Sequence, residues 1–132
     1  MLLIDGNGIP IGLDTESASP AEVTLIERLL ERRTLQRLPK RLIYDKAADS
    51  DPLRARLAAQ GIELICPHRR GRKKKATQDG RKLRRYKRRW KVERTVSWLH
   101  NFRRLVTRYE YHASLFKGFA QLACLYTTIQ RF

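Results

Sequence analysis

The chain has 132 residues, of which 42% are hydrophobic, and this is enough for one domain with a buried core. It contains no run of about 18 apolar residues that could span a membrane and no segment with the pattern of a signal peptide. Its two cysteines, Cys66 and Cys124, lie far apart, and neither belongs to a C-x-x-C pair. The composition therefore argues against a membrane protein, a disulfide framework and a zinc site, and it predicts a cytoplasmic protein.

The net charge of +16 is concentrated in one part of the chain. Residues 68–108 hold 18 lysines and arginines against two acidic residues, Asp79 and Glu93, whereas the rest of the chain has 11 basic and 11 acidic residues. A localised positive field of this kind predicts a nucleic-acid partner. An anionic membrane surface is a weaker alternative, because the segment has no broad apolar face.

The N-terminal part of the chain is predicted to form a hairpin followed by a helix. Residues 2–13 read as two short strands around a turn that is rich in glycine. The helix is predicted to begin at Pro20, with Ser19 as its N-cap and Glu22 three residues after that cap. Apolar residues then recur at helical spacing, as in an amphipathic helix.

Residues 42–67 have the pattern of a strand–helix–strand unit. The first strand is predicted to end at Asp45, and the helix is predicted to be capped by Asp51, opened by Pro52 and closed by Gly61. Such a unit implies two parallel strands in a sheet that helices cover, so the predicted fold class is α/β.

The remaining residues are predicted to form a basic loop and two helices. The loop covers residues 68–82 and is polar and punctuated by glycine. Helical patterns follow from about Lys82 to Tyr109 and again over residues 113–129. No internal repeat or linker is evident, so residues 1–132 are predicted to form a single domain.

Asp45 is a candidate functional residue because it directly follows a predicted strand. In open α/β sheets, ligands bind beyond the carboxyl ends of the strands. The alternative is that Asp45 caps a turn, although Asp49, Ser50 and Asp51 are closer to the next helix. Both interpretations remain open at this level.

Glu93 is a second candidate because it is the single acidic residue in a strongly basic stretch, residues 84–105. Its row on the predicted helix borders the apolar side, so Glu93 is predicted to lie on or near the inward edge. The alternative, favoured from the residues alone, is a local ion pair with Arg89 or support from Arg94. The other members of its row are Tyr86, Trp90 and Ser97.

Asp45 and Glu93 together would suit metal-dependent phosphodiester chemistry. Two Mg²⁺ ions about 3.5–4 Å apart activate a nucleophile and neutralise charge at phosphorus, and such hard cations bind carboxylate oxygens. The surrounding basic residues would hold the nucleic-acid backbone. Tyr86, Trp90 and Trp98 could stack on unpaired bases, but a role in the hydrophobic core is the favoured interpretation for aromatic residues at helical spacing.

Two blocks of the sequence resemble the DDE-type transposases of bacterial insertion sequences, of the insertion-sequence-five-like group. The downstream block reads YKRRWKVERTVSWLHNFRRLVTRYEYH, and the upstream block reads IYDKAADSDPLRARLAAQGIELICPHR. Both occur in the family's order, and the upstream block is similar to a D-K-x-Y-D-S segment, with Ala48 in place of the usual tyrosine. The resemblance covers nearly the whole chain.

The resemblance implies an RNase H-like fold, a mixed β-sheet flanked by helices, in a bacterial cytoplasmic protein that cuts and joins DNA ends. It assigns Asp45 and Glu93 to catalysis and to metal binding, with Mg²⁺ or Mn²⁺ in a two-metal site of the complete enzyme. The expected partner is double-stranded DNA, both insertion-sequence ends and target. Expected DNA contacts are Lys46, Arg69, Arg70, Arg72, Lys73, Lys74, Lys75, Tyr86, Arg89, Arg94, Arg103, Arg104 and Arg108.

The family's first catalytic aspartate has no counterpart here, because Asp5 matches the turn of the hairpin and is predicted to be structural. The expectation is therefore a truncated catalytic domain, inactive alone, or one that an upstream polypeptide completes, with a homo-oligomer as a further possibility. A non-catalytic basic protein that binds RNA, the ribosome or other nucleic acid is the alternative function. A sheet edge left open by a missing strand would also favour self-association.

Overall fold

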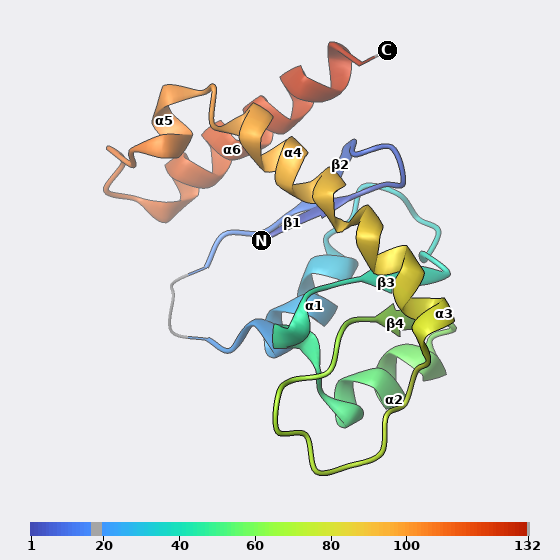
Figure 1. The fold of residues 1–132 in the computed structure, drawn as a ribbon. Coiled ribbons are helices and arrows are strands. Elements are labelled where there is room, and N and C mark those ends of the chain that lie inside the picture. Colours follow the sequence, from blue (N-terminus) through green and yellow to red (C-terminus); the bar gives the residue numbers. More distant parts are fainter. Residues whose placement is uncertain (17–19, 132) are drawn as a thin grey trace. The chain divides into compact units, whose positions relative to one another are not determined.

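The computed structural model describes residues 1–16 and 20–131 (Figure 1). The chain divides into two compact units. We call the first the hairpin unit, which comprises Met1–Pro20, Thr24–Gln36 and Trp90–Phe132. We call the second the parallel-sheet unit, which comprises Ala21–Val23 and Arg37–Arg89.

The hairpin unit begins with the antiparallel strands β1 (Leu2–Ile4) and β2 (Pro10–Leu13). Asp5 organises the turn, because its Oδ1 accepts hydrogen bonds from the backbone N–H groups of Asn7 and Ile9, both at 2.8 Å. The predicted hairpin is therefore confirmed, and the contacts of Asp5 agree with a structural role.

Helix α1 (Glu22–Glu31) buries the apolar side that its spacing predicts. Its buried residues are Leu25, Ile26, Leu29 and Leu30. The predicted N-cap, Ser19, lies outside the described residues.

The parallel-sheet unit contains the predicted strand–helix–strand arrangement. Strand β3 (Arg41–Ile43) pairs in parallel with β4 (Glu63–Ile65), and α2 (Asp51–Ala59) connects them after the 3₁₀ turn η1 (Lys46–Ala48). Leu53 and Leu57 of α2 are fully buried, as is Ile65 of β4. These residues anchor the helix over the sheet through apolar burial.

The predicted ends of α2 need one correction. The N-cap is Ser50, whose Oγ accepts from the backbone N–H of Leu53 at 3.5 Å, while Asp51 is already the first helical residue. Pro52 lies in the first turn, as predicted. Gly61 has a φ of +75°, the left-handed conformation that ends many helices, and this confirms its predicted role.

The continuous helix predicted for residues 82–109 is wrong. The structure has a short helix α3 (Gly80–Leu83), a 3₁₀ stretch η2 (Arg84–Arg89), α4 (Trp90–Leu99) and a single turn α5 (Arg103–Val106). Five of the six η2 residues are basic, and like charges at helical spacing destabilise an α-helix. The last helix, α6 (Ala113–Ile129), has the predicted bounds.

The alternation of short strands and helices confirms the α/β class, with one antiparallel and one parallel pair of strands. The RNase H-like arrangement of a single mixed sheet stays a prediction. No helix in the described part of the chain is long and apolar enough to cross a membrane.

Candidate functional site

Asp45 lies just beyond the carboxyl end of β3, where Tyr44 still continues the ladder by donating its N–H to the carbonyl of Ile65 at 3.0 Å. One carboxylate oxygen, Oδ1, caps the turn η1 by accepting from the N–H of Ala47 at 2.7 Å. The other, Oδ2, is 3.8 Å from Nη2 of Arg89, and the side chain is 35% exposed. The capping role and an outward-facing oxygen therefore coexist in one side chain.

Tyr44 is an uncharged neighbour of this carboxylate. Its hydroxyl donates to Oε2 of Glu22 at 3.1 Å. Burial raises the pKa of Tyr44 far above its ordinary value, and the carboxylates of Glu22 and Asp45 raise it further. Tyr44 therefore stays protonated, and it adds no negative charge next to Asp45.

Asp49 is the structural centre of the loop that follows β3. Its buried carboxylate accepts from Nη2 of Arg54 at 3.0 Å and from the backbone N–H of Arg69 at 2.9 Å, and it contacts Nδ1 of His68 at 2.8 Å and Nη1 of Arg72 at 3.3 Å. Burial alone would raise the pKa of Asp49, but the hydrogen bonds from Arg69, His68 and Arg54 outweigh it and hold the pKa well below its ordinary value.

His68 ties the basic loop at two points. Its Nε2 accepts from the backbone N–H of Thr77 at 3.2 Å, so Nε2 carries no proton in this arrangement and Nδ1 is the donor to Asp49. The loop from His68 to Thr77 is therefore held by side-chain contacts and not by strand pairing. Its shape therefore depends on Asp49.

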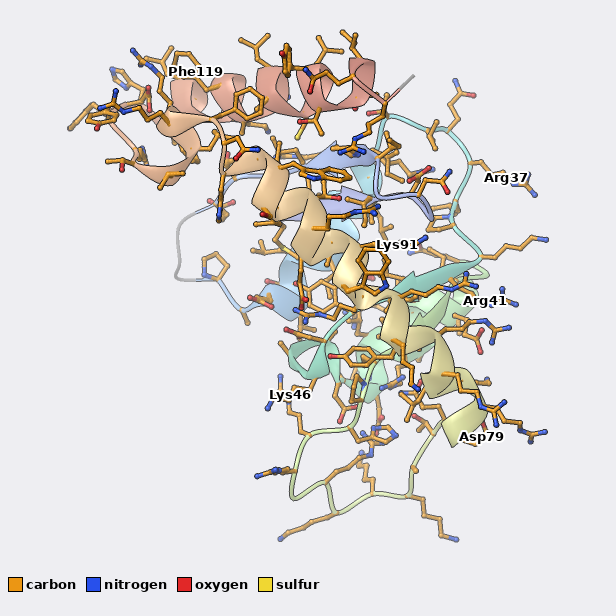
Figure 2. The ribbon with its side chains drawn as sticks, turned by 45° about the horizontal axis from the view of Figure 1, so that its top comes forward. Arg37, Arg41, Lys46, Asp79, Lys91 and Phe119 are labelled. Carbon is orange, nitrogen blue, oxygen red and sulfur yellow. The ribbon has the colours of Figure 1, made fainter. Side chains whose placement is uncertain are left out.

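The predicted DNA contacts at Lys46 and in residues 69–75 fall into two groups. Arg69 and Arg72 are engaged within the protein, because Arg69 donates to the carbonyls of Lys46 and Ala47 at 3.1 and 2.7 Å, and Arg72 pairs with Asp51 at 2.7 Å. The second group is exposed, and Figure 2 shows Lys46 reaching away from the ribbon. This group comprises Lys46, Arg70, Lys73, Lys74 and Lys75.

Glu93 lies on α4 in the hairpin unit, and its side chain is exposed. The prediction that it lies on the inward edge is wrong, because the buried side of α4 is formed by Thr95 and Leu99. Thr95 donates its hydroxyl to the carbonyl of Gly8 at 2.7 Å and thereby fixes the helix against the hairpin turn. Glu93 therefore lies on an exposed part of a helix that Thr95 fixes in place.

Arg94, which was predicted to contact DNA, packs against two tryptophans of its own helix. Its guanidinium lies 4.7 Å from the ring centres of both Trp90 and Trp98, and Nη2 donates to the carbonyl of Asn7 at 3.0 Å. Such cation–π contacts are worth about 0.5–1 kcal/mol each at exposed sites. Trp90 is half-exposed, so assigning it to the hydrophobic core is wrong.

Lys91, labelled in Figure 2, lies on the same helix, and its Nζ donates to the carbonyl of Gly6. Gly8 has a φ of +92°, and a Cβ there would lie 3.1 Å from Arg94 and 3.2 Å from Thr95. The close approach of α4 to the turn therefore requires glycine at this position.

The other predicted DNA contacts occupy a range of environments. Tyr86 is half-buried, and Arg89 lies beside Asp45. Arg104 pairs with Glu110 at 2.7 Å, which lowers the pKa of that carboxyl, and Arg108 donates to the carbonyls of Glu110 and Tyr111. Arg103 is exposed. Arg104 and Arg108 are thus committed to the segment that joins α5 to α6.

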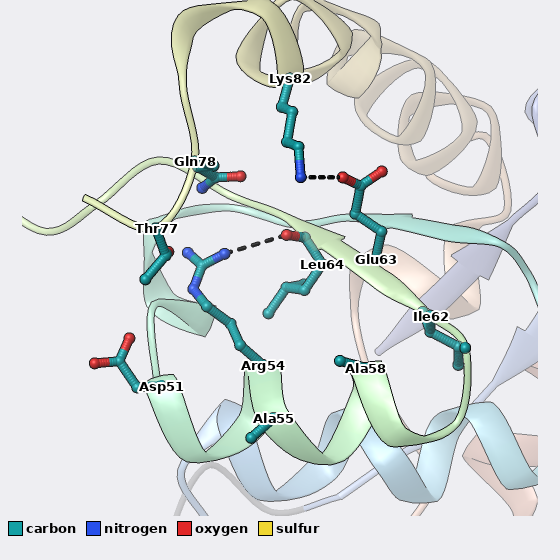
Figure 3. Close-up of a pocket in the computed structure, with 11 residues that line it drawn as sticks. Asp51, Arg54, Ala55, Ala58, Ile62, Glu63, Leu64, Thr77, Gln78 and Lys82 are labelled. Carbon is teal, nitrogen blue, oxygen red and sulfur yellow. Dashed lines mark hydrogen bonds and ion pairs between the residues drawn. The ribbon is translucent and has the colours of Figure 1, made fainter. Parts of the chain in front are cut away.

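The parallel-sheet unit also has a hollow of about 580 Å³ between α2 and β4 (Figure 3). The ion pair of Lys82 with Glu63, at 2.8 Å, lies on one side of it, and Arg54 donates to the carbonyl of Leu64 at 3.1 Å. Asp45 does not line this hollow. The hollow is therefore separate from the strand-end carboxylate.

No group of three or more histidine, cysteine, aspartate or glutamate side chains in the described residues is arranged to hold a metal ion. Asp45 and Glu93 nevertheless have the chemistry of metal ligands, since both are accessible and offer hard carboxylate oxygens. Asp45 belongs to the parallel-sheet unit and Glu93 to the hairpin unit.

Sequence reasoning missed two buried carboxylates, Asp14 and Asp49, which stabilise the two units. Asp14 follows β2 and pairs with Arg28 at 2.7 Å, with Arg32, and with Lys117 at 3.6 Å. Burial would raise the pKa of Asp14, but the three cations outweigh it and lower the pKa. Its partners come from distant parts of the sequence, so no local pattern indicates their convergence.

These features define a strongly basic α/β protein with an accessible carboxylate at a strand end. The chain belongs to the transposase DDE-domain family, since the model of that family matches residues 1–128. It is also similar to a Burkholderia cepacia protein named as a candidate transposase for insertion sequence element IS402, with 36% identity over 131 residues. That match covers 93% of this chain and 58% of the relative, so the chain spans less than two thirds of the relative's length. No solved structure matches the chain.

Proposed function

We propose that this chain is the DNA- and metal-contacting part of an insertion-sequence transposase. The observation that carries the proposal is the family match over residues 1–128, which includes both Asp45 and Glu93. The position of Asp45 beyond the end of a parallel strand supports it, because ligands of open α/β sheets bind there.

In this proposal, Asp45 and Glu93 are metal-binding carboxylates. Oδ1 of Asp45 is held by the N–H of Ala47, which orients Oδ2 outward, and Arg89 at 3.8 Å is a loose partner that a metal can replace. When bound, a divalent ion such as Mg²⁺ or Mn²⁺ activates the attacking oxygen and neutralises charge on the phosphate. A further carboxylate would come from polypeptide outside these residues, and the chain alone would be inactive.

The exposed basic residues of the loop would bind the DNA backbone. Arg70, Lys73 and Lys75 make no ion pair with any described residue that would compete with phosphate. Asp49 would shape the loop that carries them, through Arg69 and His68. Transposition would then use two surfaces of this chain, one for the backbone and one for the metal.

The test is binding of the whole chain to double-stranded DNA, followed by fluorescence anisotropy with and without Mg²⁺. With six to ten phosphates contacted, affinity should fall about 10³–10⁵-fold between about 50 and about 200 mM salt. Mg²⁺ should strengthen binding at fixed ionic strength, and Glu93→Gln should remove that effect. The matched control is Glu31→Gln, another exposed helical glutamate, which should leave it intact.

Salt-sensitive binding that is the same for Glu93→Gln, Glu31→Gln and the unmodified chain, with no effect of Mg²⁺, would contradict the proposed metal site. It would leave the chain as a non-catalytic basic nucleic-acid-binding protein. An absence of DNA binding at low salt would contradict the whole proposal.

A further inference from the structure

Arg69 makes contacts that differ from those expected of a residue that binds DNA. The family resemblance predicts a DNA contact, yet its guanidinium donates to the backbone of the turn η1, which Asp45 caps. Nε donates to the carbonyl of Lys46 at 3.1 Å, and Nη2 donates to the carbonyl of Ala47 at 2.7 Å. Two donors of one planar group therefore engage two consecutive carbonyls.

The turn η1 needs such contacts because it is short. A 3₁₀ turn of three residues has few internal hydrogen bonds, and their geometry is poorer than in an α-helix. The carbonyls at the end of a helical turn also lack partners within the turn. The fully buried Ala48 anchors η1 through apolar packing, and Arg69 provides hydrogen-bond donors for two of its carbonyls.

The contact of Arg69 with Lys46 reaches Asp45 through a single peptide group. The carbonyl of Lys46 and the N–H of Ala47 belong to the same planar unit. The carbonyl accepts from Nε of Arg69, and the N–H donates to Oδ1 of Asp45 at 2.7 Å. Because hydrogen bonds in a chain polarise one another, a peptide group that accepts at its carbonyl is a stronger donor at its N–H. Arg69 therefore strengthens the bond that orients the carboxylate of Asp45.

The backbone of Arg69 is fixed as well. Its N–H donates to the buried carboxylate of Asp49 at 2.9 Å, and its carbonyl accepts from the N–H of Arg72 at 3.3 Å. Asp49 also donates its own N–H to the carbonyl of Lys46 at 3.2 Å. Asp49 and Arg69 therefore hold the same carbonyl, and each holds the other in place.

Two neighbouring arginines provide comparisons within the same loop. Arg72 is also engaged, but its guanidinium donates to the carboxylates of Asp49 and Asp51. Arg70 is exposed and is accessible to phosphate. Among the contacts of these three side chains within the described residues, those of Arg69 reach the turn η1.

We propose that Arg69 positions the carboxylate of Asp45 for metal binding by holding the peptide group that joins residues 46 and 47. This inference rests on the proposed function, since Asp45 is there a ligand of a divalent metal. It assigns Arg69 to the metal site and leaves phosphate binding to the exposed residues of the loop. Arg69 does not touch the metal, and it acts through the N–H of Ala47.

The first measurement uses the metal-free chain, so it does not depend on the proposed metal site. In Arg69→Gln, the amide proton signal of Ala47 should move upfield in a proton–nitrogen NMR spectrum, because its bond to the carboxylate weakens. Amide signals of the buried Leu53 and Leu57 should stay in place if the unit remains folded. Arg72→Gln should move the Ala47 signal far less. An unchanged Ala47 signal in Arg69→Gln would overturn the proposal.

The second measurement is the Mn²⁺ concentration that broadens the amide signals around Asp45. Arg69→Gln should raise that concentration about 10- to 100-fold, the usual loss when a residue that orients a metal ligand is removed. Electrostatics alone predicts the opposite sign, because removing a cation favours the binding of another cation. Arg70→Gln is the matched control, since it removes the same charge from the next residue, and it should leave the concentration unchanged or lower it.

Arg69→Lys separates positioning from charge. A lysine keeps the charge, but it lacks the planar fork that reaches two carbonyls. The variant should therefore weaken Mn²⁺ binding, while the salt dependence of DNA binding stays that of the unmodified chain. A phosphate contact predicts instead that Arg69→Gln makes the slope of log affinity against log salt shallower by about one, and that Arg69→Lys restores both the slope and the Mn²⁺ response.

The outcomes distinguish this inference from the proposed function. If Mn²⁺ broadens no amide around Asp45 in the unmodified chain, the proposed metal site fails, and the positioning role fails with it. If Mn²⁺ binds there and Arg69→Gln leaves its affinity unchanged or strengthens it, the role of Arg69 is overturned and the metal site stands. Equal movement of the Ala47 signal in Arg69→Gln and Arg72→Gln would also overturn that role, because the effect would then belong to the loop as a whole.

Discussion

Asp14 and Asp45 occupy similar places in the two units, since each comes at or just after the end of a short strand in a very basic chain. Asp14 is 2% exposed and is surrounded by Arg28, Arg32 and Lys117. Asp45 is 35% exposed, and its outer oxygen has Arg89 at 3.8 Å. An aspartate after a strand is therefore available for a ligand only where the fold leaves one of its oxygens loosely paired.

The largest expected effect comes from replacing each aspartate by alanine. Asp14→Ala should lower the free energy of unfolding by about 1.5–3 kcal/mol, because it removes a buried carboxylate that accepts charge-assisted hydrogen bonds from the partly exposed Arg28 and Arg32. Asp45→Ala should lower it by about 1 kcal/mol, the loss of one capping hydrogen bond. Urea denaturation of both variants measures the difference. Equal losses would mean that Asp45 is as much a structural residue as Asp14.

Lowering the pH should destabilise the folded chain through its two buried carboxylates, Asp14 and Asp49. The pKa values of Asp14 and Asp49 are lowered in the folded chain, so the unfolded chain takes up protons first as pH falls. The free energy of unfolding should therefore be constant near neutral pH and decrease as pH falls below about 5.

The test of this pH dependence compares Asp49→Asn with the unmodified chain, each followed by urea denaturation from neutral to acid pH. Asp49→Asn should be less stable at neutral pH, and its stability should change less with pH. An unchanged slope in Asp49→Asn would contradict the assignment of the acid sensitivity to Asp49.

The basic residues also divide into those that pair within the protein and those that are exposed and can bind phosphate. Arg70→Gln with Lys73→Gln removes two exposed charges of the loop, and the slope of log affinity for DNA against log salt should become shallower by about two. Affinity at low salt should fall about tenfold or more.

Arg37→Gln with Lys40→Gln is the control, because it removes two charges outside residues 68–108. Both pairs lower the net charge equally. Equal effects of the two pairs would show that DNA responds to net charge alone and not to the loop.

The smallest effect is expected at the rim of the Asp14 cluster. Glu16 also pairs with Arg28, but its side chain is 35% exposed. Glu16→Gln should change the free energy of unfolding by no more than about 1 kcal/mol, because water and salt screen an exposed ion pair. A loss as large as that of Asp14→Ala would contradict the assignment of the stability to the buried carboxylate.

The elements with strong local signals were predictable from the sequence. The hairpin has a glycine-rich turn organised by Asp5, α2 has Pro52 in its first turn and Gly61 after its end, and α6 has an apolar pattern without interruption. Each signal acts through residues that are neighbours in the chain. Local chemistry therefore decides these boundaries.

The features that the sequence did not predict depend either on local charge repulsion or on contacts between distant residues. The break at η2 reflects repulsion along Arg84–Arg89, which a count of apolar spacing does not register. The exposure of Glu93 depends on which side of α4 the hairpin turn covers, and that is set by Thr95 and Gly8. The inward role of Arg72 depends on Asp49 and Asp51, more than 20 residues away.

The candidate site was predictable in part. The position of Asp45 after β3 follows from the strand pattern, and the family resemblance that singled out Asp45 and Glu93 agrees with the matched family. Which of the basic residues are free to bind phosphate did not follow from the sequence, because Arg69 and Arg72 differ from Arg70 and Lys73 only in their tertiary contacts.

The most direct measurement is a titration of the isotopically labelled chain with Mn²⁺, which broadens NMR signals of nearby amides. We predict that amides around Asp45 and around Glu93 broaden, that Asp45→Asn removes the broadening around position 45 and Glu93→Gln that around position 93, and that Glu31→Gln removes neither. Amides around either residue that do not broaden, or broadening that the variant of that residue leaves unchanged, would contradict the claim that both carboxylates bind metal.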